Sequence, residues 1–387
     1  QLIDNRSSFL NIFSLIHLYK NIKKYNFKII YDLQNSQRTY IYRKYLFKHI
    51  KWVTTNRKDH PISGLRGLEE MLREHFFMPK KTILLTGSGG MVGQNLLEHA
   101  DISSYDILSP RSNELDLRDF EKVENYLLKY KPEMIIHAAG KVGGIQANLR
   151  EPVNFLVDNL DMGRNIVMGA YKSGIKKLIN IGSSCMYPAN ISEPLKEDIL
   201  MTGKLEETNE GYAIAKLATA RLCEYVSRED SRFIYKTLIP CNLYGRFDKF
   251  KDDYSHLVAA IIHKIHQAKK NDANKVEVWG DGTVRREFMY AGDLADALIL
   301  SINKFDELPQ YMNIGLGVDI TIDEYYKKVA KVIGYTGILT HDKTKPVGMM
   351  RKLVNTDRQT KLGWQPKTSP EVGLQKTYEF YLQEMGK

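Results

Sequence analysis

Short apolar runs alternate along this chain with longer segments that carry apolar residues on one face. The runs are nearly continuous, which is typical of strands buried on both faces of a parallel sheet. The segments between them have the spacing of helices that cover such a sheet. The predicted strands are Lys81–Thr86, Tyr105–Leu108, Met134–Ala138, Lys177–Ile181 and Tyr235–Pro240. This alternation predicts an α/β fold, with a Rossmann-type doubly wound parallel sheet over residues 78–240.

The pattern continues beyond the fifth predicted strand. We expect helices over Tyr254–Lys269 and Ile322–Ile333, and a strand over Val276–Trp279. Residues 241–387 should mainly form a smaller α/β domain for a substrate, and we expect the chain to return to the Rossmann side near residues 286–300.

A glycine-rich turn follows the first predicted strand. Gly87, Gly90 and Gly93 fit the spacing G-x-x-G-x-x-G, and Met91 and Val92 begin the helix that comes next. Glycines at these positions turn the chain and let its backbone approach a pyrophosphate, which the helix N-terminus attracts. The strand before the turn and the helical pattern after it favour dinucleotide binding over an ordinary glycine-rich turn.

The end of the second predicted strand bears on the choice between NAD and NADP. An acidic residue there would bind the ribose 2′-hydroxyl of NAD, whereas this chain supplies Arg111, which suits the 2′-phosphate of NADP. The alternative is an ordinary surface arginine in a loop. We expect Asp116 near the adenine, and Ala138 and Ala139 beside the cofactor, because small residues let a ligand lie close to the backbone. The predicted cofactor is NADP(H).

Tyr212 and Lys216 stand four residues apart in a predicted helix, Gly211–Ser227. Positions i and i+4 share one face, so both side chains can point at one ligand. An unperturbed Tyr has a pKa of about 10, and a nearby ammonium lowers that value. The tyrosine can then protonate the alkoxide that forms when a ketone is reduced. Such pairs are common in helices. Ser183, after the fourth predicted strand, supplies a carbonyl partner.

Several segments carry a resemblance to a known family. They are Ala138–Ile145, Gly182–Pro188, Thr208–Lys216, Asn242–Gly245 and Arg286–Phe288. Over about Lys81–Tyr381 the chain resembles the extended short-chain dehydrogenase/reductases, and within them the GDP-L-fucose synthases. This resemblance implies NADPH-dependent 3,5-epimerisation and 4-reduction of GDP-4-keto-6-deoxy-D-mannose, a GDP-sugar substrate and a homodimer formed through two long helices.

The implied chemistry needs a base on one face of the sugar ring and an acid on the other. Cys185 and His256 are suitable, because free Cys and His side chains have pKa values of about 8.5 and about 6.5. The resemblance adds Ser183, Tyr212 and Lys216 for reduction at C4. Each choice has an alternative. Most cysteines simply pack in the core, as we expect of Cys223 and Cys241. His256 is one of ten histidines, and another of them could take its role.

Candidate contacts to the GDP moiety also come from the resemblance. They are Lys264, Trp279, Arg286 and Lys345. Cations suit a diphosphate, and an aromatic ring suits a base or a sugar face. The alternative is a solvated basic loop. Lys264 falls where an arginine is often found, and a lysine cannot reproduce a bidentate grip on phosphate.

Composition narrows the class of protein. The 387 residues suffice for two or three folding units, and three cysteines fit a reducing cytoplasm better than a disulfide framework. The sequence contains no run of 18 apolar residues, so we expect no membrane span. It also contains no motif that predicts a metal site. The net charge of +10 resides almost entirely in residues 1–77, which hold 14 Lys and Arg against 6 Asp and Glu. We therefore expect no nucleic-acid partner.

Residues 1–77 look foreign to the enzyme. The chain starts with Gln1, and Met78 directly before the first Rossmann strand resembles a natural start. Phe9–Ile16 with the lysines after it could form an amphipathic helix that associates weakly with anionic membrane. Lys28–Arg38 predicts a strand, a turn and a helix, and resembles part of a lipopolysaccharide heptosyltransferase. We interpret the segment as a glycosyltransferase remnant, a fusion or a gene-joining artefact.

Three functions remain open from the sequence. The first is the GDP-L-fucose synthase reaction. The second is another extended short-chain enzyme, such as a plain epimerase or 4-reductase of a different nucleotide sugar. The third is a non-catalytic protein that docks to a membrane or a partner through residues 1–77.

Overall fold

The computed structural model describes residues 29–32, 51–54, 80–250, 254–345 and 348–386. The chain divides into two compact units, Gln1–Lys80 and Lys81–Lys387. In the first unit, β1 (Ile29–Asp32) pairs in parallel with β2 (Lys51–Thr54). The strand expected after Lys28 is thus present, whereas the expected Phe9–Ile16 helix lies outside the described residues.

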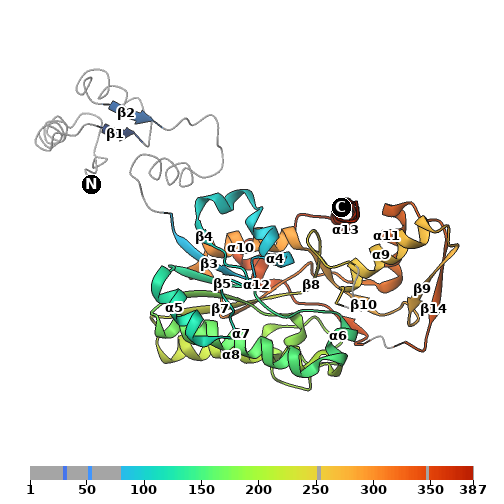
Figure 1. The fold of residues 1–387 in the computed structure, drawn as a ribbon, viewed down its shortest axis with the longest axis horizontal. Coiled ribbons are helices and arrows are strands. Elements are labelled where there is room, and N and C mark those ends of the chain that lie inside the picture. The colour runs from blue at the N-terminus through green and yellow to red at the C-terminus, as the bar shows by residue number, and fades with distance from the viewer. Residues whose placement is uncertain (1–28, 33–50, 55–79, 251–253, 346–347, 387) are drawn as a thin grey trace, which may run out of the picture. The chain divides into compact units, whose positions relative to one another are not determined.

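The second unit is built on a six-stranded parallel sheet (Figure 1). Its strand order is β12-β7-β6-β5-β3-β4. The strands are β3 (Thr82–Thr86), β4 (Asp106–Leu108), β5 (Met134–His137), β6 (Lys177–Ile181), β7 (Ile234–Pro240) and β12 (Tyr311–Ile314). The predicted Rossmann-type α/β fold is confirmed, and the five predicted strands lie within one or two residues of their expected bounds.

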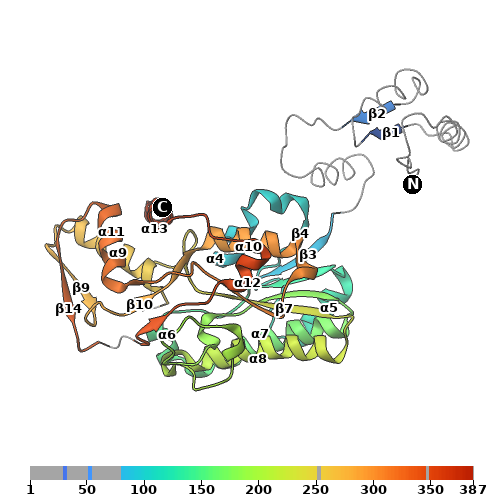
Figure 2. The same cartoon turned by 180° about the vertical axis from the view of Figure 1, so that it is seen from behind.

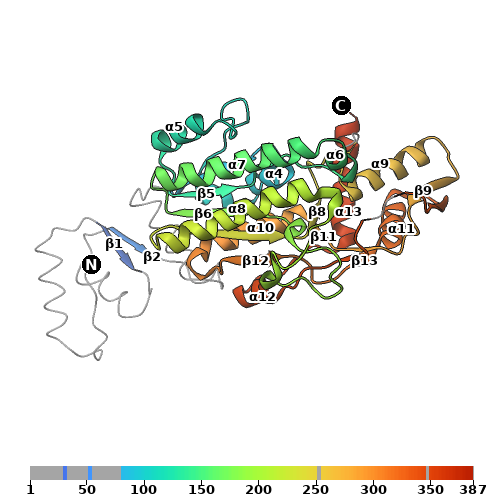
Figure 3. The same cartoon turned by 90° about the horizontal axis from the view of Figure 1, so that it is seen from below.

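Helices cover both faces of the sheet, as the continuous apolar strands require. Consecutive residues of one strand point to opposite faces of the sheet and so enter different cores. Leu84 packs with α5 (Phe120–Tyr130), α7 (Pro152–Lys172) and α8 (Glu210–Glu229). Leu85 packs with α4 (Met91–Leu97) and α10 (Ala291–Asn303). Both leucines are fully buried. Figure 3 shows α7 and α8 running side by side along one face of the sheet.

The sixth strand comes from beyond residue 240. Tyr311–Ile314 adds in parallel to the edge of β7, and α10 packs on the sheet near β3 and β5. The sheet therefore includes elements from the part of the sequence in which we expected mainly a substrate domain. The chain leaves the sheet after β7 and returns to it, because a parallel strand needs a long connection that crosses over.

A second, smaller layer of helices and strands lies at the other end of this unit (Figure 2). Its core unites α9 (Leu257–Lys270), α11 (Ile322–Ile333) and α13 (Pro370–Met385) with the strand pair β9 (Lys275–Trp279) and β14 (Ile338–Asp342). The helix α9 begins three residues later than predicted, because His256 has extended backbone angles and occupies the N-cap.

The remaining elements are short. They are α6 (Ile145–Arg150), α12 (Asp357–Leu362), β8 (Asn242–Tyr244), β10 (Arg285–Arg286), β11 (Phe288–Tyr290), β13 (Ile320–Thr321) and β15 (Arg351–Lys352), with 3-10 turns at Ala100–Ser104, Ser184–Met186, Glu197–Ile199, Glu207–Asn209 and Phe305–Glu307. None of the described helices is long and apolar enough to cross a membrane.

Candidate active site

The glycine turn between β3 and α4 packs closely against the loop that follows β5. Gly87 has a φ of +73°, and a Cβ at this position would lie 2.6 Å from the Ala139 nitrogen and 2.7 Å from the Ala138 oxygen. A Cβ on Gly93 would lie 2.6 Å from the Cα of Ser88. Only glycine fits at these two positions. The turn thus keeps the bare backbone that a dinucleotide cradle needs.

Arg111 lies over this turn. Its guanidinium occupies the space that a Cβ on Gly89 would fill, and the Ser88 hydroxyl ties the turn to the same loop by donating to the Ser109 oxygen at 3.1 Å. Asp116 lies farther along that loop, with a carboxylate that accepts hydrogen bonds from the Arg118 guanidinium at 3.0 and 2.8 Å. This contact lowers the Asp116 pKa to about 2.

Tyr212 and Lys216 share one face of α8, as predicted. Lys216 is 6% exposed, and its ammonium donates to the Ile181 oxygen at 3.0 Å, at the end of β6. It also contacts the Ala139 oxygen at 3.5 Å. Burial lowers the Lys216 pKa to about 8. This lysine therefore lies where the loops after β5 and β6 meet, within reach of anything bound at the carboxyl edge of the sheet.

Ser183 connects the tyrosine with the cysteine. Its hydroxyl accepts the Cys185 backbone N–H at 3.2 Å, and its side chain lies close enough to Tyr212 to lower the pKa of that phenol. Burial, together with the negative charge of a Cys185 thiolate, raises the Tyr212 pKa, and the Ser183 hydrogen bond only partly offsets this rise. The expected lowering by Lys216 was wrong for this state, because desolvation dominates and the ammonium lies 6.0 Å from the Tyr212 ring centroid.

Cys185 has two side-chain neighbours that the sequence analysis missed. Its Sγ accepts from the Lys352 ammonium at 3.3 Å and from the Asn209 side-chain nitrogen at 3.4 Å. Lys352 is 7% exposed, and the pairing of β10 with β15 places Arg286 beside it. Burial lowers the Arg286 pKa, while the charges of Glu206 and Cys185 oppose that shift. The Lys352 ammonium therefore contacts the thiol, and Arg286 is the residue paired with Lys352 on the neighbouring strand.

His256 stands on another element, at the N-cap of α9. Its Nδ1 lies 3.2 Å from the Asp248 carboxylate. Burial lowers the His256 pKa, but the hydrogen bond and the charge of Asp248 outweigh this, so the pKa is raised above its ordinary value. The segment that carries His256 packs on the loop after β5, because a Cβ on Gly144 would lie 2.7 Å from the Ser255 oxygen.

The other predicted substrate contacts form a separate group on β9 and its surroundings. Trp279 is 41% exposed, and the Lys345 ammonium lies 5.8 Å from the centroid of its ring. The Lys264 ammonium donates to the Glu277 oxygen at 2.5 Å, and burial lowers its pKa. Arg286 thus belongs with Cys185, whereas Lys264, Trp279 and Lys345 lie together at the strand pair.

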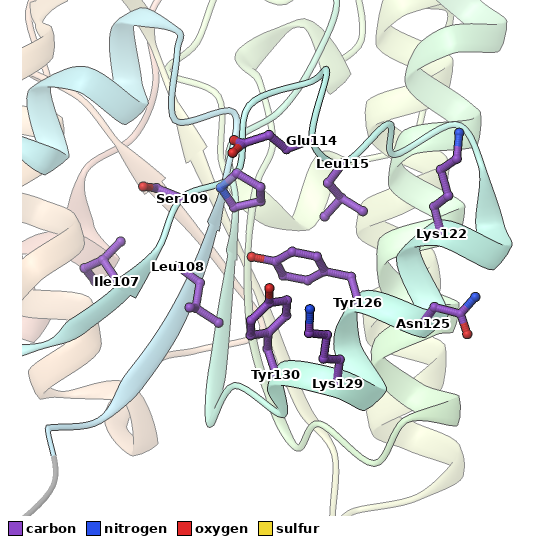
Figure 4. A pocket seen from close by; sticks show the side chains of 11 residues that line it. Ile107, Leu108, Ser109, Glu114, Leu115, Lys122, Asn125, Tyr126, Lys129 and Tyr130 are labelled. Carbon is purple, nitrogen blue, oxygen red and sulfur yellow. The ribbon is translucent and has the colours of Figure 1, made fainter.

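A hollow between β4 and α5 lies beside the loop that carries Arg111, because Ser109 and Pro110 are part of its lining. Figure 4 shows Tyr126 and Tyr130 of α5 facing it across from Leu108 of β4. No predicted site residue lines it. Among the described residues there is also no cluster of three His, Cys, Asp or Glu side chains that could hold a metal ion.

Known proteins share this architecture and sequence. Residues 83–315 match the NAD dependent epimerase/dehydratase family. A GDP-L-colitose synthase from Yersinia pseudotuberculosis is 53% identical over 78% of this chain and 98% of its own length. A GDP-L-fucose synthase from Azorhizobium caulinodans is 47% identical over 78% of this chain and 96% of its own length.

A solved structure has a similar fold. The GDP-mannoheptose C4 reductase from Campylobacter jejuni, with NADP bound, is 30% identical and covers 78% of this chain and 98% of its own, with a TM-score of 0.71. The expected resemblance is confirmed, and the glycine cradle at Gly87 and Gly93 fits the nicotinamide dinucleotide that this family uses. The chain therefore belongs to the NAD dependent epimerase/dehydratase family.

Proposed function

We propose that this chain converts GDP-4-keto-6-deoxy-D-mannose to GDP-L-fucose, using NADPH. The observation that carries the proposal is the junction at Ser183. The Ser183 hydroxyl accepts the backbone N–H of Cys185, the expected base for inversion. Its side chain also lies close enough to Tyr212, the expected proton donor for ketone reduction, to lower the pKa of that phenol. A plain 4-reductase has no need for an ionisable thiol in this turn.

The reduction uses the group on α8 and β6. Bound NADPH supplies the hydride that reaches C4 of the sugar. Tyr212 gives its proton to the oxygen at C4, and Ser183 hydrogen-bonds that oxygen. Lys216, held at the Ile181 oxygen, contacts the cofactor ribose.

The inversions come first, while C4 is still a ketone that acidifies the protons at C3 and C5. Cys185 accepts a proton from one face of the ring, and donors from Lys352 and Asn209 hold its sulfur in place. His256 returns a proton to the opposite face. This role suits an imidazole whose pKa is raised by Asp248, because it is more readily protonated near neutral pH.

Binding of the two nucleotides uses the remaining candidates. Arg111, over the glycine turn, suits the 2′-phosphate of NADPH and is the basis for preferring it to NADH. Arg286 and Lys264 suit the diphosphate of the sugar nucleotide, and the exposed Trp279 with Lys345 suits its base. Residues 78–387 carry the whole site, and we expect them to form a homodimer.

A second candidate product is GDP-L-colitose, because the Yersinia relative with that activity in its name is 53% identical to this chain. Colitose is the 3-deoxy counterpart of fucose, so C3 has no stereocentre to invert. The same residues would then serve a single inversion at C5 before the reduction.

A direct assay separates these reactions. The full chain is incubated with NADPH and either GDP-4-keto-6-deoxymannose or its 3-deoxy counterpart, loss of NADPH absorbance is followed, and the products are identified by NMR. Turnover of the first substrate to GDP-L-fucose supports the proposal, and a preference for the second identifies the colitose reaction. If neither substrate consumes NADPH, both assignments are wrong.

The role of the cysteine has its own test. Cys185→Ser should reduce inversion at C3 and C5 while leaving NADPH affinity unchanged. Cys223→Ala is the matched control, because Cys223 is fully buried in the core with Val226 and Tyr235. If Cys185→Ser leaves both inversions intact, Cys185 is not the base, whatever the overall reaction proves to be.

A further inference from the structure

His256 depends for its position on the segment that carries it. The partner of its imidazole, Asp248, comes from the same stretch of chain, before α9. Their mutual contact does not fix them relative to Cys185, which lies on the sheet side of the site. The Asp248 end of this stretch is held to α4 by the ion pair of Arg246 with Glu98 at 2.8 Å and by Asn95, which donates to the Arg246 oxygen at 3.2 Å. The His256 end needs a contact of its own with the part of the fold that carries the cofactor loops.

Tyr254, two residues before His256, makes that connection. Its hydroxyl donates to the Glu151 carboxylate, where α6 meets α7. The edge of its ring lies against Gly143, where an added Cβ would come within 3.0 Å of Tyr254 Cδ1. The next residue, Ser255, packs its carbonyl oxygen against Gly144. Side chain and backbone thus dock together on the loop after β5.

The acceptor of this contact is itself held firmly. The Lys141 ammonium lies 2.9 Å from the Glu151 carboxylate and 3.6 Å from Asp158 of α7. The Lys141 backbone is fixed as well, because its N–H donates to Asn159 Oδ1 at 2.9 Å and its oxygen accepts from Asn159 Nδ2 at 3.0 Å. The hydrogen bonds from Tyr254 and Lys141 lower the Glu151 pKa to about 2, so the acceptor stays ionised at neutral pH.

We propose that Tyr254 and Glu151 are positioning residues that set the His256 imidazole at its working distance from the sugar. This inference rests on the proposed function. Lys141–Gly144 continues directly from Ala138–Gly140, the loop at which Lys216 donates to the Ala139 oxygen. The contact therefore ties the acid on one domain to the same loop that borders the cofactor on the other.

The expected cost of losing this contact follows from the geometry of proton transfer. A catalytic acid must lie within hydrogen-bond reach of the atom that it protonates, and a displacement of about 1 Å can reduce the rate by about 100-fold. Proton removal by Cys185 does not use this contact. Loss of the Tyr254 hydroxyl should therefore leave proton removal by Cys185 intact and slow the return of a proton by His256.

The test is Tyr254→Phe in the full chain, which keeps the ring against Gly143 and removes only the hydroxyl. Incubated with GDP-4-keto-6-deoxymannose in D2O, the variant should still exchange the protons at C3 and C5, as NMR reads directly. The yield of inverted sugar should fall about 10- to 100-fold, with NADPH affinity unchanged. Glu151→Gln retains an acceptor and should show a smaller loss in the same direction.

The matched control is Tyr335→Phe, which also removes one tyrosine hydroxyl hydrogen bond, to the Ala273 oxygen at 3.0 Å. It should leave exchange and inversion at wild-type levels. His256→Asn should also exchange without inverting, and Tyr254→Phe added to it should cause no further loss. A loss in the double variant equal to the product of the two single losses would show that Tyr254 does not act through His256.

A failure of this inference can be told apart from a failure of the proposed function. If the wild-type chain converts neither sugar, the proposed function is wrong. Hydrogen exchange measured by mass spectrometry then still tests the docking itself. Tyr254→Phe should speed amide exchange in residues 254–260, and unchanged exchange there would overturn the positioning role.

Discussion

The cofactor side and the sugar side of this site are built in different ways. On the cofactor side, residues close together in sequence act together. Gly87 lies in the turn and Gly93 in the helix that follows it, and Tyr212 and Lys216 share one helix. On the sugar side, Cys185 meets Lys352 across 167 positions of the sequence. His256 is held through a contact between Tyr254 and Glu151 that spans 103 positions.

This difference reflects what each half must do. A dinucleotide lies along the carboxyl edge of parallel strands, so consecutive strand-to-helix turns can form its site. A sugar that is attacked from both faces must be enclosed, and enclosure needs side chains from a second layer of the fold. We therefore expect substitutions on the cofactor side to abolish all turnover, and substitutions on the sugar side to alter particular steps.

The largest loss should follow Tyr212→Phe, which removes the proposed proton donor from the cofactor side. General acid catalysis contributes roughly 100- to 10,000-fold, and reduction should fall by that order while NADPH still binds. Tyr225→Phe, at a position of α8 that is 47% exposed, is the control and should retain full activity. Reduction of a ketone at an undiminished rate by Tyr212→Phe would assign the proton donor elsewhere.

Gly87→Ala should disable cofactor binding, because the new methyl would meet the Ala138–Ala139 backbone within 2.7 Å. Gly174→Ala is a close control: it has an almost identical φ, +74°, but its Cβ would meet nothing within 4 Å. Both substitutions carry the left-handed strain of about 1–2 kcal/mol, so only the clash distinguishes them. Calorimetric titration with NADPH should show at least a tenfold weaker affinity for Gly87→Ala but not for Gly174→Ala. Equal affinities of the two variants would mean that the turn at Gly87 does not bind the dinucleotide.

Lys352→Met sharpens the comparison from the sugar side. Without its ammonium, Cys185 loses a neighbour at 3.3 Å, and deuterium exchange at C3 and C5 should slow by about 10- to 100-fold, within the range of general-base catalysis. Lys343→Met, an exposed lysine in the turn after β14, should change nothing. A variant that exchanges normally but binds GDP-sugar poorly would instead make Lys352 a substrate-binding residue.

The sequence predicted the cofactor side well, because its signals are local. The apolar runs placed five strands of the sheet, and spacing alone put Tyr212 and Lys216 on one helical face. Lys352 carries no such signal: it lies in a two-residue strand, and its position follows from the register that pairs it with Arg286. The sixth strand was missed because Tyr311–Ile314 joins the sheet only after the chain has crossed the second layer.

The pKa of Tyr212 shows a different limit of sequence analysis. Spacing showed that Lys216 would lie nearby, but it could not show that burial would outweigh the ammonium. Desolvation depends on the whole packed environment, and a four-residue spacing contains no information about it. The same holds for Asp248, whose effect on His256 depends on a contact between residues eight positions apart in the sequence.

Arg111→Ala should have a moderate effect confined to the cofactor side. If Arg111 binds the 2′-phosphate as proposed, loss of its guanidinium should weaken NADPH binding about tenfold, as loss of one charge-assisted hydrogen bond would, with little change for NADH. Arg232→Ala is the control, because that guanidinium is paired with Asp230 ahead of β7, away from the carboxyl edge of the sheet. Equal losses for NADPH and NADH would mean that Arg111 does not read the 2′-phosphate.

The smallest effect should be a gain in stability when Lys216 is replaced. In the ligand-free fold its pKa is lowered by burial to about 8, below the ordinary value of about 10.4. Between these values the unfolded chain binds more protons than the folded one, so stability rises with pH across this window, and below it the cost of the buried ammonium is fully present. Lys216→Met removes that cost, which is on the order of 1–3 kcal/mol.

Calorimetry should find the inactive variant a few degrees more stable than wild type at neutral pH, with a smaller difference near pH 10. Lys172→Met, at an exposed position at the end of α7, should show no such pH dependence. A variant less stable than wild type at neutral pH would mean that the hydrogen bonds to Ile181 and Ala139 outweigh desolvation, and that Lys216 holds the two loops together even without a cofactor.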